Sequence, residues 1–101
     1  MLQKLVNDFM LKYHLQTNEQ IRYIDLVSEV GELGKEIIKC TDYGKKDYAH
    51  NSKLEEELGD CLFSILALSC EMNVDAQAAL QQAMSKYETR FAHKGTIGSQ
   101  E

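Results

Sequence analysis

Two pairs of acidic residues have the spacing that a divalent-cation site requires. Glu29 and Glu32 form one acid-x-x-acid pair, and Glu57 and Asp60 form the other. In an α-helix, residues three positions apart lie on one face, because a turn takes 3.6 residues. Carboxylate oxygens are ligands that Mg²⁺ prefers, together with water and substrate phosphate. Two facing helices that each present such a pair would form a site for Mg²⁺, or for Mn²⁺ in its place.

The surroundings of the two pairs differ. The first pair belongs to a narrow acidic stripe that also contains Asp25 and Glu36, which, taken alone, is more typical of a solvated polar face than of a metal site. The second pair leads into a run of apolar and small residues, where carboxylates are costly unless their charge is compensated. Lys53 is the only base early in that segment. A cation would compensate several carboxylates at once, so the second pair favours a metal site more strongly.

Apolar residues at helical spacing predict four helices that position these pairs. We expect them over residues 2–15, 17–40, 52–72 and 76–91, with a polar loop over 41–52. Thr17 and Ser52 each begin a capping box, Asn73 is a stop signal and Asp75 is an N-cap. Three glycines adjoin the acidic pairs and predict a close approach of the helix backbones: Gly31, Gly34 and Gly59.

The middle of the third predicted helix, residues 61–70, carries no charge on any side. Such a helix lies at the centre of a bundle or in an oligomer interface. We expect one helical domain over residues 1–92 and a flexible C-terminal tail over 93–101. The predicted fold is all-α, like a four-helix bundle. Because so short a chain buries little surface alone, we expect association with a second copy to complete the core.

Charge and composition exclude several classes of protein. The net charge of −5 argues against a nucleic-acid partner, which would need a basic face. No apolar run approaches the roughly 20 residues that cross a bilayer, and the N-terminus is not typical of a signal peptide. Cys40, Cys61 and Cys70 lack paired spacing and are expected to be free thiols. A cytoplasmic protein with no membrane partner is therefore expected.

The order of these motifs resembles one enzyme family. The segments EVGEL, from Glu29, and ELGDCLF, from Glu57, are similar to the ExxE and ExxD halves of the signature of MazG-like nucleoside triphosphate pyrophosphohydrolases. Twenty-four residues separate Glu32 from Glu57, a gap that suits the family. The segment from Ala83 to Phe91, AMSKYETRF, is similar to the family's closing A-x-x-K-F-x-x-R-F pattern. The resemblance covers residues 25–91 and implies an all-α fold that works as a homodimer or homotetramer.

This resemblance implies a magnesium-dependent hydrolase that cleaves a nucleoside triphosphate between its α- and β-phosphates, releasing a nucleoside monophosphate and pyrophosphate. The implied metal ligands, one of which would also act as general base, are Glu29, Glu32, Glu57 and Asp60. Lys86 and Arg90 would approach the phosphates, although basic residues near a helix C-terminus also favour its dipole. Met84 stands where relatives often have asparagine, which leaves the base preference open. The implied role is the removal of non-standard nucleotides.

Three alternatives remain. A non-catalytic, oligomerising helical module could carry the same acidic residues on its surface. A phosphoribosyl-ATP or a dUTP pyrophosphohydrolase of the same superfamily would share the motifs. A di-iron carboxylate bundle is disfavoured, because it needs Glu-x-x-His pairs and the chain has only Asp47 and His50 at an acid-x-x-His spacing, in the predicted loop.

Overall fold

The structure, a computed structural model, describes residues 1–95 of the chain. Within this range the chain forms four helices and no strand: α1 (Leu2–Lys12), α2 (Glu19–Lys39), α3 (Ser52–Glu71) and α4 (Ala76–Lys94). The all-α prediction is confirmed. In the same part of the chain, no helix combines the length and the apolar character that a membrane span needs.

Three of the helices begin at a side-chain cap. Asp75 caps α4, as predicted, and accepts a hydrogen bond from the backbone N–H three residues later. Asn18 caps α2 and Asn51 caps α3 in the same way. The predicted caps Thr17 and Ser52 are therefore wrong by one residue. In each case an adjacent asparagine, which is at least as good a cap, takes the extended conformation.

The helix ends differ from prediction at both termini of the chain. The first helix stops at Lys12, because His14 has a left-handed φ of 56°. The third helix ends before Asn73, whose φ of 58° confirms the predicted stop. The fourth helix continues to Lys94 and ends at Gly95, so residues 93–94 are helical and not part of a tail. Of the predicted tail, residues 96–101 lie outside the described part of the chain.

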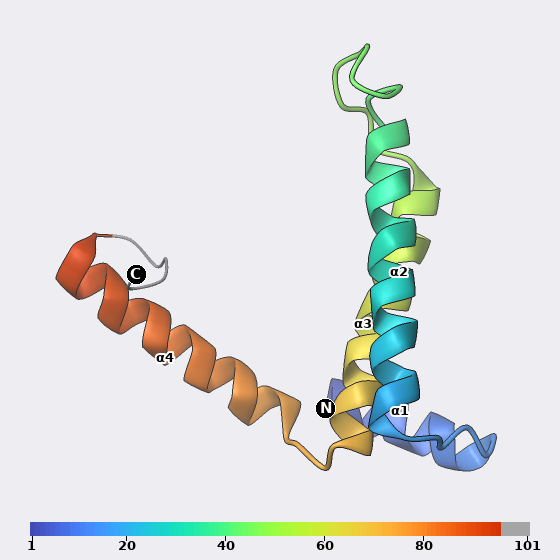
Figure 1. Cartoon of the computed structure of the whole chain (residues 1–101), viewed down its shortest axis with the longest axis vertical. Coiled ribbons are helices and arrows are strands. Elements are labelled where there is room, and N and C mark those ends of the chain that lie inside the picture. The colour runs from blue at the N-terminus through green and yellow to red at the C-terminus, as the bar shows by residue number, and fades with distance from the viewer. Residues whose placement is uncertain (96–101) are drawn as a thin grey trace.

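Helices α2 and α3 form an antiparallel hairpin, and α1 packs across α3 near the end from which α4 departs (Figure 1). The small core lies where α1 meets α3 and consists of Val6, Met10, Leu66 and Ala67. Met10 and Ala67 are almost inaccessible to solvent. This core holds α1 against the C-terminal half of α3, while α2 runs alongside α3 as far as the Arg22–Glu71 ion pair at the end of α3.

Helix α4 leads away from the other three helices (Figure 1). Its first residue, Ala76, packs against the core, and the helix then projects outward. The radius of gyration is 16.7 Å, whereas a compact domain of this length has about 13 Å. One chain therefore forms a three-helix unit with a projecting arm instead of a closed four-helix bundle. Leu62 and Ile65 of α3, predicted to be buried on all sides, are 45% and 47% exposed.

Candidate metal centre

Three of the four predicted metal ligands meet between α2 and α3. Glu29 comes from α2, and Glu57 and Asp60 come from α3. One carboxylate oxygen of each lies within 4.8 Å of the others. We call these three residues the carboxylate cluster. The two helices bring them together because they pair antiparallel, with each acidic motif facing the other helix.

The three members differ in exposure. Glu57 is buried, with 8% of its surface exposed, Glu29 is half-buried and Asp60 is exposed. The cluster therefore extends from the helix interface to the solvent. A buried carboxylate at the inner end fixes the position of the site, and an exposed one at the outer end leaves access for a ligand from solution.

The charge of the cluster is only partly compensated. Lys53, one turn before Glu57 on α3, places its Nζ 3.6 Å from Oε1 of Glu57. Among the side chains that the structure describes, no base forms an ion pair with Glu29 or Asp60. Three carboxylates with one ammonium leave a net negative site, which a divalent cation would neutralise.

The negative charge also shows in the proton affinities of neighbouring groups. Burial, followed by the charges of Asp60 and Glu57, raises the pKa of the Glu29 carboxyl. Burial, followed by the charges of Glu29 and Glu57, raises the pKa of the Cys61 thiol. The Cys61 thiol therefore holds its proton more tightly than a free thiol, and the carboxylate oxygens are the candidate ligands.

The donor set fits a hard cation. It consists of carboxylate oxygens, which Mg²⁺, Mn²⁺ and Ca²⁺ all accept. Oxygens that share one such ion lie about 3–5 Å apart, and the 4.8 Å limit of the cluster agrees with this range. The residues present therefore fit the cation that the sequence motifs imply.

Glu32, the fourth predicted ligand, does not join the cluster. It lies on α2 three residues after Glu29, and its side chain is exposed. It is close enough for its charge to contribute to the raised pKa of Glu29. The structure thus places Glu32 beside the cluster, on the solvent side.

Two residues that support the site were not assigned a role from the sequence. Glu36 is buried, and its Oε1 accepts a hydrogen bond of 3.4 Å from Nδ2 of Asn51. Asn51 also caps α3, so this contact joins the start of α3 to α2 one turn beyond Glu32. The signal for Glu36 was its place in the acidic stripe. No local sequence pattern indicates the role of Asn51, because its hydrogen-bond partner Glu36 is distant in the sequence.

The glycines do not mark a close approach of backbones. A Cβ built at Gly31, Gly34 or Gly59 would meet nothing within 4 Å. The prediction of a close backbone approach at these positions is wrong for the single chain. Gly31 and Gly59 are instead exposed, so they leave open space beside the acidic residues.

The predicted phosphate-binding residues are not brought to the cluster within one chain. Lys86 and Arg90 lie in the second half of α4, the part of the chain that projects farthest from α2 and α3 (Figure 1). Lys86 is exposed, with its Nζ 5.5 Å from the centre of the Tyr87 ring, and Arg90 is half-buried.

The described residues form an all-α fold with a carboxylate cluster, a candidate metal site, between two antiparallel helices. Residues 16–94 match the model of the MazG nucleotide pyrophosphohydrolase domain, and the chain belongs to this family. The matched range includes both acidic pairs, Lys86 and Arg90.

Relatives of known name share parts of the chain. The nucleoside triphosphate pyrophosphohydrolase/pyrophosphatase MazG of Thermotoga maritima is 54% identical over 39% of this chain and 15% of its own length. The nucleoside triphosphate pyrophosphohydrolase of Escherichia coli K12 is 36% identical over 61% of this chain and 24% of its own length. The chain thus spans less than a quarter of either enzyme.

A third relative is closer in size. The uncharacterized protein YpjD of Bacillus subtilis is 32% identical over 70% of this chain and 65% of its own length. No solved structure matches this chain significantly.

Proposed function

We propose that the chain is a nucleoside triphosphate pyrophosphohydrolase, which adds water to an NTP or dNTP to give a nucleoside monophosphate and pyrophosphate. The observation that carries the proposal is the meeting of Glu29, Glu57 and Asp60 between α2 and α3. It is supported by membership of the MazG family and by two relatives whose names give this activity. The biological role proposed is removal of non-standard nucleotides.

In this proposal the carboxylate cluster holds Mg²⁺, with Mn²⁺ as a substitute. When bound, such a cation neutralises the polyphosphate and lowers the pKa of a water molecule. The buried Glu57 fixes the depth of the site, and the exposed Asp60 faces the side from which a nucleotide enters. Lys53 already offsets part of the charge of Glu57.

Glu32 has two possible roles in the proposal. The family resemblance assigns it as a fourth metal ligand. Its position outside the cluster leaves its oxygens free to accept a proton from the attacking water, the task of a general base. The two roles differ in their effect on metal affinity, so a single substitution separates them.

The deciding experiment measures pyrophosphate release from canonical and modified nucleoside triphosphates, dUTP included, with Mg²⁺ and with chelator. Glu57→Gln is the test variant. Glu56→Gln is the matched control, because Glu56 is the neighbouring exposed carboxylate on α3. We expect release that requires Mg²⁺, persists in the control and is lost in the test variant.

No release from any substrate, together with a melting temperature that Mg²⁺ does not change, would support the non-catalytic helical module instead. Release from dUTP alone, or from phosphoribosyl-ATP in a parallel assay, would assign the chain to the corresponding branch of the superfamily. The cytoplasmic location stays a prediction, supported by the three free cysteines.

A further inference from the structure

Three charged residues are buried in the part of the chain that the structure describes: Arg22, Glu36 and Glu57. All three lie where α2 contacts α3, a region that we call the seam. Glu57 belongs to the carboxylate cluster, whereas the proposed function uses neither Arg22 nor Glu36. Because a buried charge is costly unless it is paired, these two residues require an explanation of their own.

Apolar packing in the single chain does not fix the position of α2 along α3. The only buried residues of α2 are Arg22 and Glu36, and its least exposed apolar residues, Leu26 and Leu33, are half-buried. Apolar contacts have no direction, so they oppose a shift along the seam only weakly. A shift by one helical turn is about 5.4 Å. It would separate Glu29 from the α3 carboxylates, whose oxygens lie within 4.8 Å of its own.

Arg22 makes polar contacts on both sides of the seam. Its Nε lies 3.7 Å from Oε2 of Glu71, the last residue of α3, and its Nη1 lies 3.8 Å from Oδ2 of Asp25 on α2. Its Nη2 donates a hydrogen bond to the Leu15 carbonyl, in the connection that precedes α2. The side chains of Arg22 and Glu71 are 10% and 12% exposed, so salt and water screen this ion pair little.

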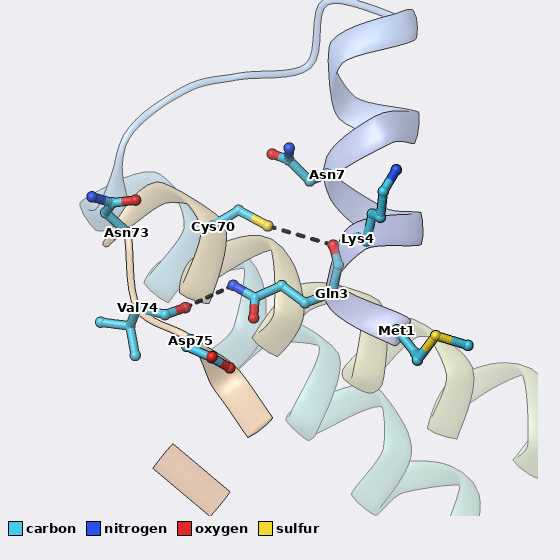
Figure 2. A pocket seen from close by; sticks show the side chains of 8 residues that line it. All are labelled: Met1, Gln3, Lys4, Asn7, Cys70, Asn73, Val74 and Asp75. Carbon is cyan, nitrogen blue, oxygen red and sulfur yellow. Dashed lines mark hydrogen bonds between the residues drawn. The ribbon is translucent and has the colours of Figure 1, made fainter. Parts of the chain in front are cut away.

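The end of α3 that carries Glu71 is held by other contacts as well. Oε2 of Glu71 accepts a hydrogen bond of 2.7 Å from the Thr17 backbone N–H. As Figure 2 shows, the thiol of the preceding residue, Cys70, points to the Gln3 carbonyl of α1, and the Gln3 side chain reaches the Val74 carbonyl just beyond α3. Because α1 holds this end of α3, Glu71 gives Arg22 a well-positioned partner.

The distances along the two helices explain why a long side chain is needed here. Asp60 lies eleven residues before Glu71, a rise of about 16 Å, and Glu29 lies seven residues after Arg22, a rise of about 10 Å. Since α2 and α3 are antiparallel (Figure 1) and Glu29 meets Asp60, the backbones of Arg22 and Glu71 are offset by about 6 Å. Side chains lean toward the N-terminus of their own helix, so these two lean toward each other and close the offset.

We propose that Arg22 is a positioning residue of the metal centre: its ion pair with Glu71 sets the register of α2 on α3 that assembles the carboxylate cluster. A single buried polar contact can fix the register of a helix pair. This inference rests on the proposed function, because the cluster is the proposed metal site, and adds a residue that the family signature does not contain. The contact of Asn51 with Glu36 lies at the opposite end of the same seam.

Calorimetric titration with Mg²⁺ tests the effect on the metal centre. We expect Arg22→Met to bind Mg²⁺ about 10- to 100-fold more weakly than the wild type, the usual effect of losing a residue that orients metal ligands. Arg22→Lys keeps the charge and most of the reach, so it should recover most of the affinity. The matched control is Val6→Ala, which weakens the core between α1 and α3 and leaves the seam unchanged. Equal Mg²⁺ affinity in folded Arg22→Met and in the wild type would overturn the proposal.

A second readout needs no metal. Nδ2 of Asn51 lies 3.4 Å from Oε1 of Glu36, which is about 21 Å along α2 from Arg22. Nuclear Overhauser contacts between the Asn51 and Glu36 side chains therefore report the register at the far end of the seam. We expect Arg22→Met to lose these contacts and Val6→Ala to keep them. Contacts that persist in a folded Arg22→Met variant would show that the ion pair acts only at its own end, and would overturn the proposal.

A milder variant keeps both measurements decisive if Arg22→Met does not fold. Glu71→Gln removes the charge and keeps an acceptor for the Thr17 N–H, and we expect it to change Mg²⁺ affinity and the far contacts in the same direction. Combining it with Arg22→Lys should add little, because the two residues act through one contact. If the wild type itself binds no Mg²⁺, the proposed function fails, and loss of the far contacts in the variants still supports the register.

Discussion

The ammonium of Lys53 lies 3.6 Å from Oε1 of Glu57, one turn away on α3. Within the described side chains, it makes the only ion pair with a member of the carboxylate cluster. Glu57 is buried, whereas the Lys53 side chain is 56% exposed. Lys53 therefore stabilises the buried carboxylate from the solvent side and competes with any cation for the same oxygen.

Replacing this lysine should strengthen metal binding. We expect Lys53→Met to bind Mg²⁺ between about 1.5- and 5-fold more tightly, since an exposed ion pair contributes about 0.2–1 kcal/mol. The metal-free protein should melt at a slightly lower temperature. Calorimetric titration with Mg²⁺ measures the first effect, and Lys35→Met, on an exposed lysine of α2, is the control. Weaker Mg²⁺ binding in the Lys53 variant would mean that the lysine does not compete.

The cluster carboxylates should be needed for turnover and not for folding. We expect Glu57→Gln and Asp60→Asn each to lower the rate of pyrophosphate release by more than about a hundredfold, because metal-assisted catalysis contributes several kcal/mol. Each change removes a like charge, so the metal-free variants should melt no lower than the wild type. Unfolding of both variants would instead identify these acids as structural.

The Mg²⁺ affinity of a Glu32 variant distinguishes the two roles proposed for this residue. If it accepts the proton from water, Glu32→Gln should lose turnover by about 10²–10⁴-fold and bind Mg²⁺ as tightly as the wild type. This is the outcome that its place outside the cluster favours. A parallel loss of Mg²⁺ affinity would make it the fourth ligand that the family resemblance implies. Calorimetry and single-turnover kinetics on the same preparation separate these two results.

The pKa of Glu29 should make metal-free stability depend on pH. Burial and the charges of Asp60 and Glu57 raise this pKa above its ordinary value of 4.5. Between the two values, the folded protein holds a proton that the unfolded chain has lost, so the free energy of unfolding falls as pH rises through the folded-state pKa. The Glu29→Gln variant has no titrating carboxyl at this position, so it does not lose this stability as the pH rises.

The variant should therefore melt above the wild type in chelator at neutral pH. This advantage should shrink as the pH falls through the folded-state pKa and vanish well below about 4.5, where the wild-type carboxyl is protonated in both states. Melting curves of the variant and the wild type in chelator, from neutral pH down to below about 4.5, measure this difference in melting temperature. An advantage that does not change with pH would show that Glu29 acts through packing and not through its charge.

Local signals explain what the sequence could predict. The helices follow from apolar periodicity, and the stop at Asn73 and the N-cap at Asp75 follow from the chemistry of single residues. The meeting of Glu29 with Glu57 and Asp60 follows from two helical pairs on helices joined by one loop. The caps of α2 and α3 were predicted at Thr17 and Ser52 but lie at the adjacent residues Asn18 and Asn51. The sequence did not separate them, because threonine, serine and asparagine all stabilise a helix start.

The direction of α4 could not be predicted in this way. It depends on Gln3, whose hydrogen bonds to Val74 and Ala76 span more than 70 residues of sequence. Nothing in the sequence near Gln3 or near the turn indicates this contact. The positions of Lys86 and Arg90 relative to the cluster therefore depend on a long-range interaction, which periodicity and spacing do not contain.

Removal of the Gln3 side chain should loosen the arm. Gln3→Ala loses two hydrogen bonds to backbone groups of the turn, and we expect the free energy of unfolding to fall by about 1–3 kcal/mol in urea. The control is Gln16→Ala, because Gln16 is exposed in the connection between α1 and α2. Sedimentation should also show more than one oligomeric form, since α4 then leaves the turn in more than one direction. Equal stability and a single form in both variants would mean that the core contact of Ala76 alone sets the direction of α4.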